Sequence, residues 1–247
     1  ALTHHPEWSD VVATYLRNQF QNKTMTAAAE KTVTDLLTVF GAQQEIRSLV
    51  FSLLRDAAIS DDRKRLLLDN FSISSGDIKL PASTSLLRDL LRDKNAAVQS
   101  RVLDLIQLHA IAGFDKDLNN IIWDDGALPA FRMKALSARL MSTPRLSEEE
   151  FHLVLQLGSK GQDADFRRTA AALLSQALLT DSQLRLLAEN HVTNADVFLL
   201  PALMKAFEGN TNERVGMALV KALSAKADRL DNISPEQLDK LLKTFPP

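Results

Sequence analysis

Apolar residues recur with a helical period along almost the whole chain. They occupy positions i, i+3, i+4 and i+7, which share one face of a helix. Alternating runs of β-branched residues are almost missing, and the best of them, at 192–197, is short and polar. The pattern therefore predicts an all-α fold. Three of the apolar stripes are Leu103, Ile106 and Ala110; Leu173, Leu174, Ala177 and Leu178; and Met217, Val220 and Leu223.

Capping residues and the few glycines and prolines set the predicted helix ends. Thr26 begins one helix, and Ser147 with Glu150 three residues later has the capping-box spacing. Gly158 is predicted to end the helix that Ser147 begins. The predicted helices lie at about 6–20, 26–41, 44–58, 60–70, 83–93, 96–112, 114–123, 128–141, 147–158, 164–179, 181–190, 196–207, 212–226 and 234–244.

These helices are short and closely connected, so none of them can bury its apolar stripe alone. Their starts share a pattern: a turn residue, a polar or small stretch, and then a bulky apolar residue usually followed by Arg. The bulky residues Ile46, Val98, Phe131 and Phe166 recur at irregular intervals of roughly 40 residues. The spacing predicts a right-handed α-solenoid of HEAT- or armadillo-like helical hairpins. Phe166 is predicted to be a core position.

The repeat pattern predicts one helical-repeat domain over 1–247. Residues 1–40 are expected to cap the array, 41–80 to form an irregular repeat with an extra helix at 61–70, and 81–247 to form regular repeats. The chain opens at Ala1 without a signal-peptide pattern and closes in a loop-like Thr-Phe-Pro-Pro. We therefore expect either an internal segment of a larger multidomain protein or a processed chain.

Composition excludes several classes of function. The chain has no cysteine, so it has no disulfide, no thiolate metal site and no cysteine nucleophile. Net charge is −2 and aromatic residues make up 6%, which argues against nucleic-acid binding. No apolar run approaches the roughly 20 residues of a membrane-spanning helix. We predict protein partners, no nucleic acid and no membrane span.

The histidines do not have metal-ligand spacing. His4 and His5 lie next to the terminus, and His109, His152 and His191 stand on separate predicted helices or helix ends. A zinc pair such as HExxH places two histidines four residues apart on one helix. We therefore predict no metal and no cofactor.

The serines and acids also favour structural interpretations. The segment 158–161 (Gly-Ser-Lys-Gly) resembles part of a phosphate-binding loop but lacks the full GxxxxGK(S/T) spacing. The Gly-x-Ser-x-Gly motif of a hydrolase nucleophile does not occur. Acid runs at 115–117, 124–125 and 148–150 begin predicted helices, where negative charge complements the helix dipole. We assign no catalytic, cofactor-binding or metal-binding residue, and the binding residues stay unknown.

Arg47, Arg132 and Arg167 recur at equivalent places in the repeats. One interpretation makes them a ladder for an anionic partner. The other, which we favour, is that each binds a backbone carbonyl or an aspartate of the neighbouring repeat. Trp8 and Trp123 are predicted to pack in the core or between repeats.

The segment 164–247 resembles the helical region of the bacterial, planctomycete-type membrane-bound dehydrogenase proteins. The resemblance rests on repeat motifs, and 93–108 is similar to a repeat of that region. The matching stretches are Asp165-Phe-Arg-Arg-Thr-Ala-Ala-Ala-Leu-Leu, Leu179-Thr-Asp-Ser-Gln-Leu, Leu200-Pro-Ala-Leu-Met-Lys-Ala-Phe-Glu-Gly, Val215-Gly-Met-Ala-Leu-Val-Lys-Ala-Leu, Ser234-Pro-Glu-Gln-Leu and Phe245-Pro-Pro.

Proteins of that family carry a sugar-dehydrogenase-like β-propeller before the HEAT-like repeats and a c-type cytochrome domain with CxxCH after them. The resemblance therefore implies a non-catalytic, extracytoplasmic scaffold that links a dehydrogenase domain to a haem domain. No residue of this chain matches either active part. The alternative is a free-standing adaptor that binds peptides or proteins on the concave face of the solenoid, and an all-α enzyme is the least favoured reading.

Overall fold

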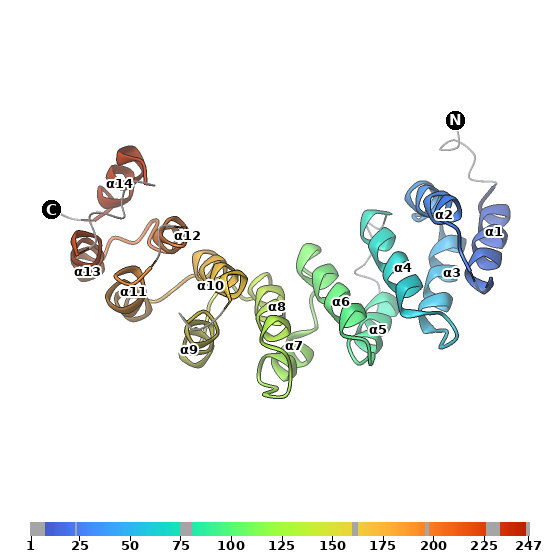
Figure 1. Ribbon diagram of the computed structural model, residues 1–247, viewed down its shortest axis with the longest axis horizontal. Helices are drawn as coiled ribbons and strands as arrows, with labels where there is room; N and C mark the ends of the chain where they lie inside the picture. The colour runs from blue at the N-terminus through green and yellow to red at the C-terminus, as the bar shows by residue number, and fades with distance from the viewer. Residues whose placement is uncertain are drawn as a thin grey trace. The chain divides into compact units, whose positions relative to one another are not determined.

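The computed structural model describes residues 8–22, 24–74, 81–159, 163–195, 198–225 and 233–245, with backbone alone at 71–74 and 81–83. Every regular element in these ranges is helical, which confirms the predicted all-α fold (Figure 1). The chain divides into two compact units, Ala1–Asn120 and Ile121–Pro247. The prediction of a single domain stays a prediction. His4, His5 and the predicted first turn at Pro6 lie outside the described residues.

The first unit stacks its helices in two rows. α1, α3 and α5 are neighbours in one row, and α2, α4 and α6 are neighbours in the other. Across the two rows, α1 packs against α2, α3 against α4, and α5 against α6. Each hairpin therefore buries its apolar stripe against the next, as a solenoid requires. The helices are α1 (Ser9–Gln21), α2 (Ala27–Phe40), α3 (Gln44–Arg55), α4 (Asp61–Ser74), α5 (Pro81–Leu90), α6 (Ala96–Leu108) and α7 (Asp115–Ile122), the last of which crosses the boundary between the units.

The second unit is also built from neighbouring helices. α8 packs against α9 and α10, α10 packs against α12, and α11 with its π-helical extension η3 packs against α13. This unit too is solenoid-like, while the right-handed sense and the HEAT or armadillo type stay predictions. Its elements are α8 (Pro129–Leu140), α9 (Glu148–Leu157), α10 (Ala164–Gln176), α11 (Asp181–Leu187), η3 (Ala188–Val192), α12 (Leu200–Lys205), α13 (Glu213–Ser224) and α14 (Pro235–Leu242).

Side-chain caps begin many of these helices. Thr26 accepts a hydrogen bond from the backbone N–H of Ala29, and Ser147 and Glu150 form the predicted capping box. Each cap satisfies N–H groups that the first helical turn leaves without an intrahelical partner. Gly158 is the C-cap of α9, as the sequence predicts. Further capping boxes begin α11 at Thr180 and α14 at Ser234.

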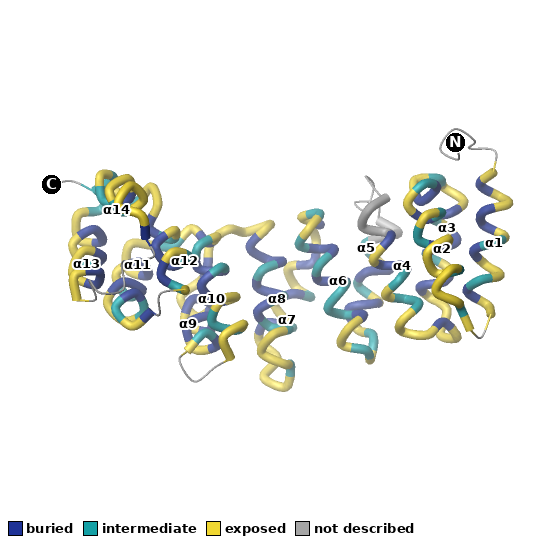
Figure 2. The backbone as a smooth tube through the Cα atoms, turned by 45° about the horizontal axis from the view of Figure 1, so that its top comes forward, coloured by how far each residue is buried: buried dark blue, intermediate teal, exposed yellow. Residues whose placement is uncertain are grey.

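The core lies between the rows, where buried positions recur on the helix sides that face their neighbours (Figure 2). Ile46 and Val98 are fully buried, in agreement with the repeat pattern. Phe131 and Phe166 are only partly buried. The prediction that Phe166 is a core position is therefore wrong, because the following turn of α10 carries the buried residues.

Two of the predicted apolar stripes continue past the end of their helix, and the third includes residues on an exposed face of its helix. Ala110 and Leu178 are exposed, because α6 and α10 end before them. On α13, Met217 and Val220 are 60% and 46% exposed, while another face of the same helix is buried. The periodicity is that of a helix, but α13 is apolar on two sides, and among the described residues only one of these sides is buried.

Candidate functional site

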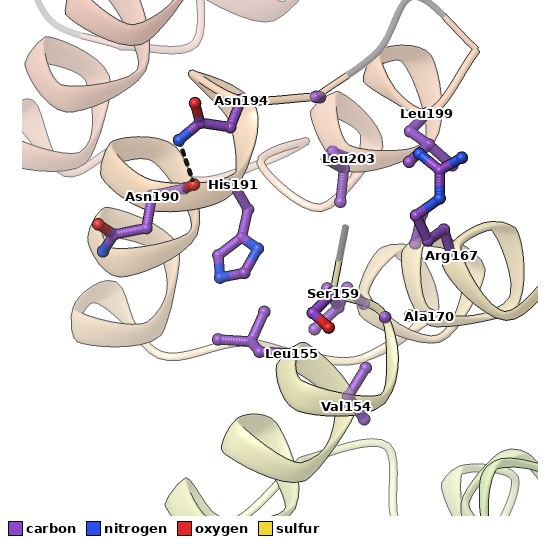
Figure 3. Close-up of a pocket in the computed structure, with 14 residues that line it drawn as sticks. Val154, Leu155, Ser159, Arg167, Ala170, Asn190, His191, Asn194, Leu199 and Leu203 are labelled. Atoms are coloured by element: carbon purple, nitrogen blue, oxygen red, sulfur yellow. Dashed lines mark hydrogen bonds between the residues drawn. The ribbon is translucent and has the colours of Figure 1, made fainter. Parts of the chain in front are cut away.

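A pocket of about 350 Å³ lies in the second unit where α9, α10, η3 and α12 meet (Figure 3). Its volume falls in the range of small ligand sites, about 300–1,000 Å³. Most of its lining is apolar, and several polar groups stand among the apolar side chains. The lining residues are Val154, Leu155, Gly158, Ser159, Arg167, Ala170, Ala171, Leu174, Asn190, His191, Asn194, Ala195, Leu199 and Leu203.

Small residues bring α9 and α10 together beside the pocket. Gly158 lies so close to Ala170 that a Cβ at position 158 would collide with the Cβ of Ala170. Ala170 and Ala171 are both 3% exposed and present only methyl groups to the pocket. The close approach and the short side chains together leave an open volume that larger residues would fill.

The π-helix η3 supplies the polar side of the pocket. It extends α11, where the sequence predicts one regular helix to about residue 190. Both the backbone N–H and the hydroxyl of Thr193 donate to the carbonyl of Ala188, at 3.3 and 3.1 Å. That backbone bond spans five residues, which widens the helix, and π-helical turns occur frequently at functional sites.

His191 projects from η3 into the pocket (Figure 3). Burial lowers the pKa of its imidazole, because the charged form loses solvation. Among the described residues, no hydrogen bond to the ring is found. The neutral ring therefore offers one donor and one acceptor to a molecule in the pocket. Beside it, Asn194 Nδ2 donates to the carbonyl of Asn190 at 3.0 Å.

The three repeated arginines are divided between the two units, with Arg47 in the first and Arg132 and Arg167 in the second. Arg132 Nε donates to the carbonyl of Ile122 at 2.8 Å, and its Nη1 lies 3.1 Å from Asp125. Arg132 thus takes the structural role that we favoured, although its acceptors lie in the segment just before its own helix. Arg167 lines the pocket, and Arg47 belongs to α3 of the other unit.

The acid runs are used within the fold. Asp117 binds Arg88 at 2.8 Å, and Glu150 binds Arg139 at 2.6 Å. Asp124 accepts the backbone N–H of Gly126 and stabilises a turn. These contacts agree with the structural interpretation of the acids, since each carboxylate neutralises an arginine or caps backbone N–H groups.

Asparagine and aspartate connect successive helix pairs in both units. In the first unit, Asn95 at the start of α6 donates to Asp61 at the start of α4, at 2.6 Å. In the second unit, Asn210 and Asn212 before α13 donate to Asp181 at the start of α11, at 2.8 and 2.7 Å. The same side-chain contact thus recurs one helix pair apart in each unit, and we call these contacts the Asn–Asp latches.

Further polar contacts join helices of the first unit. Lys64 Nζ lies 3.0 Å from Asp93. Burial alone would raise the pKa of Asp93, but the backbone N–H of Asn95 and the Lys64 ammonium outweigh it and lower the pKa. Arg88 reaches Asp117 and also lies over the Phe114 ring, 5.3 Å from its centroid. Each contact joins residues from successive helix pairs.

The histidines and tryptophans that the sequence singles out lie in different environments, some buried and some exposed. The His152 ring contacts Phe151 edge-on, and the Nε2 atom of His109 is buried. Trp8 and Trp123 are 40% and 47% exposed, so neither is a fully buried core residue, and their packing between repeats stays a prediction. Within the described ranges, no group of three or more His, Cys, Asp or Glu side chains is placed to hold a metal ion.

No protein-family model matches this chain, and no curated protein matches it either. Fold and pocket together define an all-helical, repeat-like protein with a ligand-sized pocket in its second unit. In the part of the chain that the structure describes, no helix is long and apolar enough to cross a membrane. Sequence reasoning missed the pocket, and its signal was the pairing of Gly158 with the small residues Ala170 and Ala171.

Proposed function

We propose that the chain is a non-catalytic helical scaffold for protein partners. The observation that carries this proposal is the set of polar contacts between successive helix pairs, above all the Asn–Asp latches. Apolar packing alone tolerates sliding, whereas directional hydrogen bonds fix the register of one helix against the next. A fixed register is what a scaffold needs in order to hold its partners at a defined separation.

The resemblance to the dehydrogenase-associated repeats makes the proposal more specific. On this view the scaffold lies between a β-propeller dehydrogenase domain and a c-type haem domain, and it keeps electron donor and acceptor in a constant relation. Its location would then be extracytoplasmic. The chain itself offers no site for covalent haem attachment, because it has no cysteine.

The coding sequence on both sides of this segment tests the linking role. We expect a run of β-propeller repeats before it and a CxxCH motif after it, in one reading frame. A reading frame without either element would contradict the linking role and leave the scaffold as a separate protein. If both elements are present, double electron–electron resonance on the full-length protein, purified with its haem, measures whether the redox domains keep a constant separation.

The pocket favours a second candidate function, that of an adaptor for peptides or proteins. Its walls suit an apolar side chain of a partner, and His191 can hydrogen-bond to the main chain beside that side chain. Interfaces frequently concentrate their binding energy on one such buried anchor residue. This pocket lies wholly within the second unit, so the proposed adaptor function depends on no feature of the first unit.

N-acetyl-leucinamide and N-acetyl-phenylalaninamide can serve as probes of the adaptor reading. We expect millimolar binding, followed by NMR, with chemical-shift changes centred on Ala170 and His191. Ala171→Leu fills the pocket and should abolish these changes, whereas Ala172→Leu, at a half-buried position outside the lining, is the matched control. Shifts spread evenly over the chain, or unaltered by Ala171→Leu, would contradict the adaptor function.

A further inference from the structure

α13 carries apolar residues on two faces. Val215, Leu219 and Ala222 point inward and are at most 3% exposed. Met217 and Val220 lie on another face and are 60% and 46% exposed. They line a groove of about 830 Å³ together with the partly buried Leu242 and Phe245 of the α14 segment. A helix with a second apolar face generally has a second neighbour.

Two opposite charges stand at equal distances from the centre of this exposed face. Glu213 lies four residues before Met217, and Lys221 lies four residues after it. Positions i, i+4 and i+8 share one side of a helix, about 6 Å apart along its axis. Glu213, Met217, Val220 and Lys221 are all exposed, and we call them the outer face of α13. Among the described residues, neither Glu213 nor Lys221 forms an ion pair.

This arrangement is complementary to itself. A second copy of α13, laid antiparallel across the first with the two-fold axis at Met217, brings Met217 against Met217 of the second copy. The same rotation brings Glu213 against Lys221 of the second copy, and Lys221 against Glu213 of the second copy. One contact between residues of opposite charge is thus made twice, as in every isologous two-fold interface.

We propose that the outer face of α13 is a homodimer interface, with a second copy of this chain as its occupant. The apolar centre with charges at its edge matches the usual anatomy of an interface. The groove border carries both signs, with Arg185, Arg214 and Lys221 against Glu189 and Glu213. A partner of uniform charge would meet repulsion there, whereas an inverted copy of α13 sets Glu213 against Lys221 on both sides of the two-fold axis.

The interface is small, so the dimer is weak and depends on concentration. A contact centred on one 12-residue helix lies near the lower limit of specific interfaces, about 1,000 Å². Phe245 packs on Gly216, where a Cβ would lie 2.7 Å from the ring, and this contact holds α14 beside the groove. The dimer therefore joins second units, and it goes beyond the proposed scaffold by bringing two scaffolds together.

Because the chain has no cysteine, a single introduced cysteine reports on this geometry directly. Met217→Cys lies on the predicted two-fold axis and should form a disulfide-linked dimer under mild oxidation. Val11→Cys, at a position that is 71% exposed on α1 of the other unit, is the matched control and should stay monomeric. Equal cross-linking of the two variants, or none of Met217→Cys, would overturn the proposal.

Charge reversal with rescue tests the register of the interface. Glu213→Lys and Lys221→Glu each replace two attractive pairs by two repulsive ones, and each should weaken dimerisation about tenfold in sedimentation equilibrium. The double variant restores both pairs and should restore the dimer, while all three keep the wild-type thermal unfolding. A wild-type chain that is monomeric at every concentration, single variants that dimerise normally, or a double variant without rescue would each overturn the proposal. Binding of α13 to a different protein would then be the alternative.

Discussion

Arg139 and Glu150 form a buried ion pair in the second unit. Arg139 Nη2 lies 2.6 Å from Glu150 Oε2, and the two side chains are 9% and 8% exposed. Glu150 Oε2 also accepts the backbone N–H of Ser147 at 2.8 Å, and Arg139 donates to the carbonyl of Arg145 at 3.1 Å. One pair thus joins the end of α8 to the capping box of α9.

Removal of one member of this pair should be far more costly than replacement of both. Glu150→Ala leaves the Arg139 charge buried without its partner, and we expect the free energy of unfolding to fall by about 3–5 kcal/mol. The double variant Arg139→Met/Glu150→Met removes both charges and should be more stable than Glu150→Ala. Urea denaturation of the three proteins measures this, and a single variant as stable as the wild type would show that the pair is energetically irrelevant.

The Asn–Asp latch at Asp181 should contribute measurably to stability. Asp181→Ala removes the acceptor of Asn210 and Asn212, and a loss of about 1–2 kcal/mol is expected for two exposed hydrogen bonds to a carboxylate. Asp181→Asn keeps one acceptor oxygen and should lose less. Asp239→Ala, which removes an exposed contact to Lys243 on α14, serves as the control in thermal unfolding. Equal stability of Asp181→Ala and the wild type would mean that the latch does not fix the helices.

The close approach of α9 and α10 makes Gly158 sensitive to a methyl group. Gly158→Ala forces the new Cβ against Ala170, so the helices must separate, and we expect a loss of about 1–3 kcal/mol. Gly126→Ala is the control, because its Cβ would meet only the Asp124 carboxylate, at 3.2 Å. Denaturant midpoints of the two variants should therefore differ, and equal midpoints would contradict the packing described for this pocket.

His191 should make stability depend on pH. Burial lowers its pKa in the folded state below the unfolded value of about 6.5. Between these two pKa values the unfolded chain binds more protons, so stability falls as the pH is lowered through about 6.5 and levels off below the folded-state pKa. His191→Gln should remove this part of the pH dependence in urea titrations at pH 5–8. A pH profile unchanged in His191→Gln would show that the ring is not desolvated.

Much of the fold could be predicted from local sequence signals. The helical period, the Thr26 cap and the capping box of Ser147 and Glu150 were all confirmed, because each depends on residues within about four positions of one another. The end of α11 could not be predicted in this way. Its change to a π-helix depends on Thr193 reaching back to Ala188, one residue beyond the reach of regular helical bonds.

The sequence by itself determined where the helices lie, that they are too short to stand alone, and that no cysteine chemistry is available. Only the tertiary structure decided which side of α13 is covered, how deeply Phe166 is buried, and that His191 faces a pocket between four helical segments. The physical reason is that helix formation follows from neighbours along the chain, whereas burial follows from neighbours in space. A helix that is apolar on two faces, such as α13, carries no local signal that tells one face from the other.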